Sequence, residues 1–155
     1  MDRKQAILSE ITSARESLVE LAGELSEADL ARPTRNEGWT VKDTLAHAVA
    51  SEAGLRLTAE RILRGETTAA PGPSLAERNA AAIQKRKDKS LLELLKEAAA
   101  ARQQTLALLE GLTPDQLDVA GHMASGREAT VDWIIVHIGE HEAQHAEDIR
   151  LALGQ

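Results

Sequence analysis

The sequence contains no cysteine, phenylalanine or tyrosine, and tryptophan occurs only at Trp39 and Trp133. The absence of cysteine excludes disulfides, thiolate metal ligands and a cysteine nucleophile. Runs of β-branched and aromatic residues, which favour strands, are also missing. The hydrophobic residues, 43% of the chain, are mostly leucine, alanine, isoleucine and valine, and leucine and alanine favour helices. The composition therefore predicts an all-α protein with an aliphatic core.

The chain also lacks a concentrated basic surface, because its formal net charge is −7. General binding to a phosphate backbone requires such a surface, so no nucleic-acid partner is expected. The densest basic stretch, residues 85–89, lies among acidic helices and is interpreted as a solvated face. The N-terminus has no apolar signal core, and no segment approaches the length of a membrane span. We therefore expect a cytoplasmic location and no membrane partner.

Apolar residues recur at helical spacing in four long segments, and a shorter segment has a helix cap of its own. The predicted helices are residues 3–25, 40–64, 74–87, 90–110 and 130–153. Four amphipathic helices of similar length favour a four-helix bundle, in which a long crossover, residues 65–90, carries the short extra helix. A chain of 155 residues is near the usual size of one domain, so residues 1–155 are expected to form one.

Two parts of the chain follow the same plan. Residues 25–30 and 112–117 each contain a helix-capping pattern and lead, after a loop, to a Thr-Val pair. A histidine lies seven residues after each of these threonines, at His47 and His137. The similarity predicts two helical hairpins with a shared plan. An old duplication and a coincidence both explain so short a match, but the comparison draws attention to His47.

Three of the five histidines, His137, His141 and His145, follow one another at four-residue spacing near the C-terminus. In a helix this spacing turns each side chain by about 40° from the last, so neighbouring imidazoles can bind one ion. Measured from the centre of the apolar stripe, His145 lies about 40° away, His141 about 80° and His137 about 120°. His141 and His145 are therefore candidate metal ligands, with a purely structural pair as the alternative. His137 is expected beside the site or on the surface.

A catalytic metal usually has three protein ligands and an open position, so the pair needs a third ligand. His47 is the candidate, because small residues on its side of the helix leave space beside the imidazole. These residues are Thr44, Ser51, Gly54 and Thr58. Their hydroxyl groups either orient a substrate or simply pack between helices, and the alternative for His47 is an exposed position near the start of its helix. His122, in a glycine-rich loop, is expected to be solvent-exposed.

Residues 141–145 also spell H-E-x-x-H, a motif that zinc peptidases carry. Such peptidases generally take their third ligand from downstream, and only ten residues follow His145. No sheet is expected that could hold an extended peptide, so peptidase activity is disfavoured. Glu142 lies about 20° from the centre of the apolar stripe. A buried carboxylate needs a partner, so Glu142 either orients a ligand or a water, or pairs with a basic side chain of a neighbouring helix.

Residues 38–47, Gly-Trp-Thr-Val-Lys-Asp-Thr-Leu-Ala-His, resemble the G-W-[ST]-x-x-[DE]-x-L-x-H segment of the DinB/YfiT-like superfamily. The segment from His141 to His145, with Ile149 after it, resembles the C-terminal H-x-x-x-H segment of that family. The resemblance implies a four-helix bundle, often dimeric, in which His47, His141 and His145 bind Zn²⁺, Ni²⁺ or another divalent ion. It also implies a chemistry: some relatives are transferases or isomerases that use a low-molecular-weight thiol, and others resemble a cyclopropane hydrolase of colibactin self-resistance.

The expected function is a metal-dependent enzyme that transfers or hydrolyses a small electrophilic substrate through a metal-activated thiol or water. The expected assembly is a homodimer, and no catalytic side chain is assigned. The alternative is a non-catalytic protein that sequesters a small toxic molecule or a metal ion. Ala146 and Glu147 stand where relatives often have a basic residue, and the sequence shows no clear basic cluster for the carboxylates of a thiol. Trp39 and Trp133 are expected in the core or at the pocket mouth.

Overall fold

The computed structural model describes residues 2–66 and 72–155, and within them the chain is mainly helical. The helices are α1 (Arg3–Ala22), α2 (Glu27–Leu30), α3 (Val41–Leu63), α4 (Leu75–Lys85), α5 (Leu91–Gly111), α6 (Pro114–Leu117) and α7 (Val131–Ala152). Two short strands, β1 (Ala120–His122) and β2 (Glu128–Thr130), form an antiparallel hairpin. The predicted crossover includes residues 67–71, which lie outside the described residues.

The four long helices begin where the sequence places a capping side chain. Asp2, Thr40, Ser90 and Thr130 are the N-cap residues of α1, α3, α5 and α7, and each side chain accepts a hydrogen bond from a backbone N–H of the first turn. These groups have no partner within the helix, so the caps satisfy donors that the fold would otherwise bury or leave to water.

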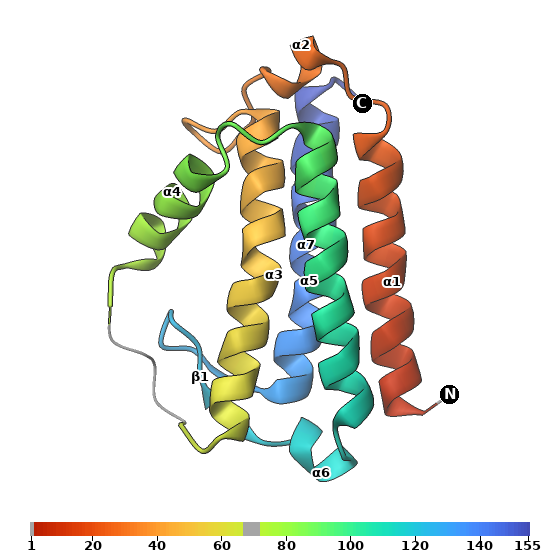
Figure 1. The fold of residues 1–155 in the computed structure, drawn as a ribbon, viewed down its shortest axis with the longest axis vertical. Helices are drawn as coiled ribbons and strands as arrows, with labels where there is room; N and C mark the ends of the chain where they lie inside the picture. The colour runs from red at the N-terminus through yellow and green to blue at the C-terminus, as the bar shows by residue number, and fades with distance from the viewer. Residues whose placement is uncertain (1, 67–71) are drawn as a thin grey trace.

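Figure 1 shows α1, α3, α5 and α7 side by side as a four-helix bundle, as predicted. In this view α1 and α7 run upward and α3 and α5 run downward, because the connection after α3 returns to the top before α5 begins. That connection carries α4, which packs on the outer side of α3. None of the helices in the described part of the chain is long and apolar enough to cross a membrane.

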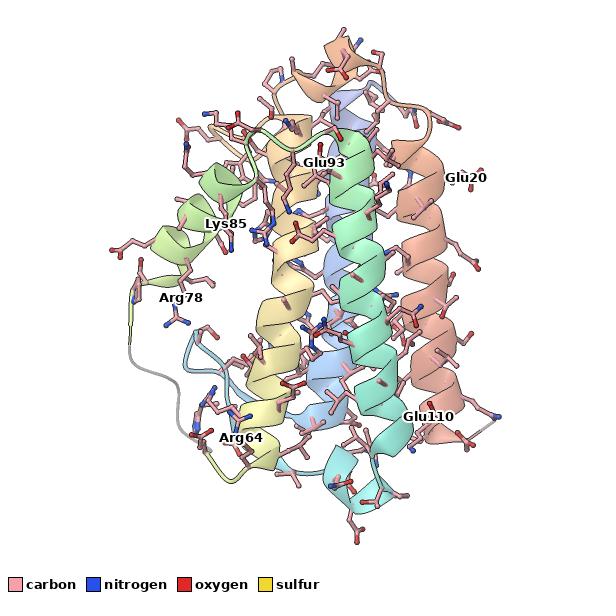
Figure 2. All side chains as sticks on the ribbon, in the orientation of Figure 1. Glu20, Arg64, Arg78, Lys85, Glu93 and Glu110 are labelled. Carbon is pink, nitrogen blue, oxygen red and sulfur yellow. The ribbon has the colours of Figure 1, made fainter. Side chains whose placement is uncertain are left out.

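Aliphatic side chains fill the bundle in two clusters. One includes Ile11, Ile134 and Ile135, and the other includes Leu45 and Ile149. Acidic side chains such as those of Glu20, Glu93 and Glu110 lie on the outside of the helices (Figure 2). Along α3, α5 and α7, the buried charged residues Glu52, Arg102 and Glu142 lie between the residues of these two clusters.

The β1–β2 hairpin is a difference from the all-helical expectation. Each strand has only three residues, with Ala120 opposite Thr130 and His122 opposite Glu128. Three residues are too few to show the alternating apolar and polar pattern of a strand in the sequence. The chain reversal and the packing of Gly121 against Ile62 position the two strands instead. The prediction of an exposed His122 is wrong, since this residue lies half-buried in β1.

The two halves share the local plan of caps and loops that the sequence predicted. α2 and α6 each begin with a capping box, at Ser26 and Thr113 respectively. The same backbone contact then closes both loops: Val41 N–H donates to the carbonyl of Arg32, and Val131 N–H donates to that of Val119, both at 2.9 Å. α1–α3 and α5–α7 therefore share one order of helix, capped turn, loop and helix. They are not the packed hairpins that the sequence predicted, because α1 and α3 both pack against α5 and α7 and scarcely against each other. The β1–β2 pair enlarges a contact that is an isolated bridge in the first half.

Candidate metal centre

The structure brings together the three imidazoles that the sequence singled out. His47 comes from α3 and is buried, while His141 and His145 lie one turn apart on α7, half-buried and buried. The Nε2 atom of His141 is 3.2 Å from that of His47 and 3.0 Å from that of His145. One ligand atom from each of the three lies within 4.8 Å of the others. The site could therefore hold one metal ion between α3 and α7.

Burial keeps these imidazoles neutral. It lowers the pKa of His47 to about 4, with a further contribution from the neighbouring His145. It lowers the pKa of His141 to about 3, again helped by the adjacent imidazoles. The pKa of His145 is also lowered by burial, and its contact with Asp148 opposes that change. At neutral pH each ring therefore has a lone pair, which is the form that binds a metal.

Asp148 fixes the orientation of His145. The Nδ1 atom of His145 lies 3.0 Å from a carboxylate oxygen of Asp148, whose side chain is 2% exposed. The same carboxylate accepts hydrogen bonds from Arg35 Nε at 2.6 Å and from Asn36 Nδ2 at 3.0 Å. A carboxylate acceptor at Nδ1 holds the proton there and leaves Nε2 free for a metal. Sequence reasoning missed this role, although the three-residue spacing on one helix face was a usable signal.

The surroundings of His47 are aromatic on one side and polar on the other. Trp39 lies 4.8 Å from His47 and 6.4 Å from His145 between ring centroids, and it is half-buried beside the site. Ser51 donates to the carbonyl of His47 at 2.7 Å, and its hydroxyl lies 3.5 Å from the Nε2 atom of His47. Thr44 is fully buried and bonds the carbonyl of Thr40, so it packs within the bundle.

His137 lies beside the three imidazoles and outside their cluster, as its helical phase predicted. Its ring stacks on Trp133, with centroids 4.6 Å apart and planes at 15°, and it lies 5.8 Å from His141. The buried Nδ1 atom of His137 has no hydrogen-bond partner among the described residues and is 3.5 Å from a carboxylate oxygen of Glu140. Trp133, His137 and His141 thus form a row along α7 that ends at the candidate metal site.

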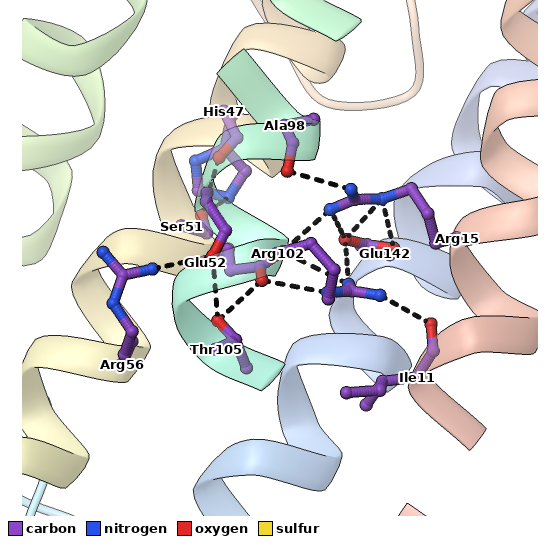
Figure 3. Close-up of polar contacts among 11 residues, drawn as sticks. Ile11, Arg15, His47, Ser51, Glu52, Arg56, Ala98, Arg102, Thr105 and Glu142 are labelled. Atoms are coloured by element: carbon purple, nitrogen blue, oxygen red, sulfur yellow. Dashed lines mark hydrogen bonds and ion pairs between the residues drawn. The ribbon is translucent and has the colours of Figure 1, made fainter. Parts of the chain in front are cut away.

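Glu142 points away from the imidazoles and into a buried cluster of four charges. It accepts hydrogen bonds from Arg15 at 2.6 Å and from Arg102 at 2.8 Å, and both arginines also contact Glu52 (Figure 3). Thr105 donates to Glu52 at 2.7 Å. Burial raises the pKa of Glu142, while the two arginines oppose the change. Of the two roles open for Glu142, the structure shows the ion pair.

The charge cluster follows the internal symmetry of the fold. Arg15 Nη1 donates to the carbonyl of Ala98 at 3.0 Å, and Arg102 Nη1 donates to that of Ile11 at 2.9 Å. Ala98 lies one helical turn before Arg102, and Ile11 lies one helical turn before Arg15. Each of the four long helices contributes one charge, so the cluster ties their positions along the bundle axis together. In Figure 3 it extends to the right of His47 and Ser51.

A cavity of about 450 Å³ opens beside the candidate metal site, between α3, α4, the β1–β2 hairpin and α7. His47, His141 and His137 form part of its wall, together with the residues of α3 that the sequence predicted to leave space: Ser51, Gly54 and Thr58. Its outer wall contains Arg78 and Arg127, which sequence reasoning did not identify because α4 and the hairpin loop meet only in the folded chain. Figure 2 shows Arg78 directed from α4 toward that loop.

A second hollow, of about 610 Å³, lies between α1 and α7. It is lined mainly by small residues such as Ser13 and Gly139 and contains none of the three imidazoles. The cavity that bears on the chemistry is therefore the one of about 450 Å³.

A profile of the DinB superfamily matches residues 10–149. No curated protein sequence matched the chain.

Solved structures with the same fold span several activities. YfiT from Bacillus subtilis, described as a probable metal-dependent hydrolase with an unusual four-helix bundle topology, has a TM-score of 0.78 at 18% identity, covering 99% of this chain and 90% of YfiT. The mycothiol-dependent maleylpyruvate isomerase has a TM-score of 0.74 at 16% identity, covering 96% of this chain and 63% of the isomerase. The colibactin self-resistance protein ClbS, solved in complex with a dsDNA, has a TM-score of 0.75 at 15% identity, covering 98% and 96%. At these identities the likeness shows the fold.

Proposed function

Because this chain belongs to the DinB superfamily and brings three neutral imidazoles together beside a cavity, we propose that it is a metal-dependent enzyme. The proposed reaction transfers or hydrolyses a small electrophilic substrate through a metal-activated thiol or water. The proposed ligands are His47, His141 and His145, and the proposed ion is Zn²⁺ or Ni²⁺.

The spacing of the imidazole nitrogens is the observation that carries this proposal. In a tetrahedral site with Zn–N distances of about 2.0–2.1 Å, neighbouring nitrogens lie about 3.3 Å apart. The Nε2 separations of 3.0 and 3.2 Å at His141 are close to that value. Where these Nε2 atoms carry lone pairs, separations this short are repulsive unless a cation or a proton lies between them. The donor set therefore fits a divalent ion, which these three residues would hold beside the cavity.

The residues around the site have defined tasks in this proposal. When bound, a divalent ion supplies Lewis acidity and lowers the pKa of a coordinated water or thiol. Asp148 keeps the proton of His145 on Nδ1, so that Nε2 remains a ligand. Trp39 covers the site on the side of His47 and His145 and limits access of bulk water. Ser51 lies in the cavity wall within 3.5 Å of the Nε2 atom of His47, where its hydroxyl can orient a bound substrate.

Metal analysis of the purified protein tests the ligand set. We expect close to one equivalent of a divalent metal in the unchanged protein and loss of most of it in His47→Ala. His122→Ala is the matched control, because His122 lies in β1 and outside the three-imidazole cluster. Equal metal content in the two variants would show that His47 is not a ligand.

Turnover distinguishes the enzyme from its alternative, a non-catalytic protein that sequesters a small toxic molecule or a metal ion. Metal-loaded protein is incubated with electrophiles in the presence and absence of low-molecular-weight thiols. Substrate loss beyond one equivalent supports an enzyme, and dependence on the thiol assigns the nucleophile. Depletion that stops at one equivalent supports sequestration.

The remaining parts of the proposal concern the setting of the enzyme. We place it in the cytoplasm as a homodimer, with residues 1–155 as one domain. We keep the absence of a nucleic-acid partner as a prediction based on the net charge of −7. The dsDNA complex of ClbS weighs against that prediction, and a gel-shift assay with dsDNA would decide it.

A further inference from the structure

Two arginines in the cavity wall lack the partners that other arginines of this chain have. Arg3, Arg35 and Arg86, for example, are each paired with a carboxylate. Among the described residues, neither Arg78 nor Arg127 is paired with one. The remaining residues, Met1 and 67–71, include no aspartate or glutamate. In a chain with a net charge of −7, two unpaired arginines facing one cavity are unexpected.

The contacts of these arginines leave most of their donors available. Arg78 uses Nε to donate to the carbonyl of Pro73 at 3.0 Å, and its terminal nitrogens make no hydrogen bond within the described part of the chain. The guanidinium carbon of Arg127 lies 4.3 Å from the centroid of the Trp133 ring, and this cation–π contact is its only side-chain interaction with the described residues. Asn79, next to Arg78 on α4, also lines the cavity.

The rest of the cavity is shaped for a small molecule with an apolar body. Its volume of about 450 Å³ falls in the range typical of sites for small organic ligands. Leu55, Met123 and Trp133 give it an apolar wall, and His47 and His141 also line it. The cavity therefore offers cationic donors in the planar geometry that matches a carboxylate, and it also borders the candidate metal site.

We infer that this cavity binds a small organic substrate that carries a carboxylate, with the anion held by Arg78 and Arg127 and the reactive end directed toward His47 and His141. This inference rests on the proposed function for the reaction itself, but the recognition of the anion depends only on the cavity. The sequence had shown no clear basic cluster for the carboxylates of a thiol, whereas the folded chain brings these two arginines to one cavity.

A pair of isosteric probes tests the inference. Phenylacetate and the neutral phenylacetamide have the same apolar body and differ in charge, and ligand-observed NMR gives the dissociation constant of each. A charge-assisted hydrogen bond contributes enough for a tenfold or larger difference in affinity. We expect the unchanged protein to bind phenylacetate at least about tenfold more tightly than the amide. Equal affinity for the two probes, or no binding of either at millimolar concentration, would overturn the inference.

Single variants locate the anion. Arg78→Gln and Arg127→Gln are each expected to weaken phenylacetate binding by about tenfold and to leave the amide unchanged. Arg64→Gln is the control, because Arg64 is 62% exposed, pairs with Glu66 and does not line the cavity. An equal loss of phenylacetate affinity in all three variants would show that the effect comes from the net charge of the protein, and this would overturn the inference.

The same titrations separate this inference from the proposed function. They are run with metal-free and metal-loaded protein, and metal content is measured for every variant. A preference for phenylacetate that requires Arg78 and Arg127 in both forms supports the inference, even if no reaction is found. A preference seen only in the metal-loaded form, and unchanged in both arginine variants, would assign the carboxylate to the ion and overturn it.

Discussion

Replacement of Asp148 by asparagine should weaken metal binding without removing a ligand. The carboxylate is 2% exposed and accepts from three donors, of which the Nδ1 atom of His145 at 3.0 Å is the one that matters for the site. Asparagine keeps the shape but removes the charge, so the hydrogen bond to Nδ1 loses about half its strength. The proton can then move to Nε2, the atom that faces His141 at 3.0 Å. Loss of such an outer partner typically lowers metal affinity by about 10–100-fold, or about 1.4–2.7 kcal/mol.

A competitive titration against a chromophoric chelator measures this change in the dissociation constant. The matched control is Glu147→Gln, because Glu147 precedes Asp148 on α7, is 53% exposed and, among the described residues, is ion-paired only with Arg150. We expect the control to bind metal as the unchanged protein does. Thermal unfolding of the metal-free variants shows whether Asp148→Asn remains folded. If folded Asp148→Asn and Glu147→Gln have the same metal affinity, Asp148 does not orient His145 for a metal.

Two further predictions concern stability. The pKa values of His47 and His141 are about 4 and about 3 in the folded protein and near 6.5 in the unfolded chain. Between about pH 6.5 and pH 4 the unfolded chain therefore binds more protons than the folded protein. The unfolding free energy of metal-free protein should fall as the pH decreases through this range. Urea titrations at several pH values measure this change. A His47→Ala/His141→Ala variant with the same pH dependence would refute this origin. Arg102→Met should cost about 3–5 kcal/mol of unfolding free energy, because two buried carboxylates then share one arginine. Arg32→Met, at a half-exposed surface pair, should cost less than about 1 kcal/mol in the same assay, and an equal loss in both would contradict the argument.

Local signals in the sequence were sufficient for the bundle and for the three imidazoles. The capping residues and apolar periods predicted the long helices, because both depend on neighbours within one or two turns. Helical phase also ranked the histidines correctly: His145 is buried, His141 is half-buried and His137 lies outside the cluster. The likeness of the two halves pointed to His47, which the structure places against the other two.

The parts that sequence reasoning missed depend on segments that meet only after folding. Asp148 gains its role from Arg35 and Asn36, which lie in an irregular loop with no period. Arg78 and Arg127 share a cavity because α4 packs on α3 opposite the hairpin loop. The charge cluster around Glu142 had only a weak signal in the sequence. Each of the four long helices has a charged residue within its apolar stripe, and buried charges require partners of opposite charge. Which residues pair could not be read without the arrangement of the helices.

The division of the candidate ligands between the two halves of the chain has a consequence for folding. His47 belongs to the first half, whereas His141 and His145 belong to the second, and the first-half positions that correspond to them hold Ser51 and Leu55. Neither half alone carries three ligands. An ion between α3 and α7 would therefore bind fully only after helices of both halves have packed together. Such binding would stabilise the complete bundle relative to any partly assembled form, so the two halves would unfold together as a single cooperative unit.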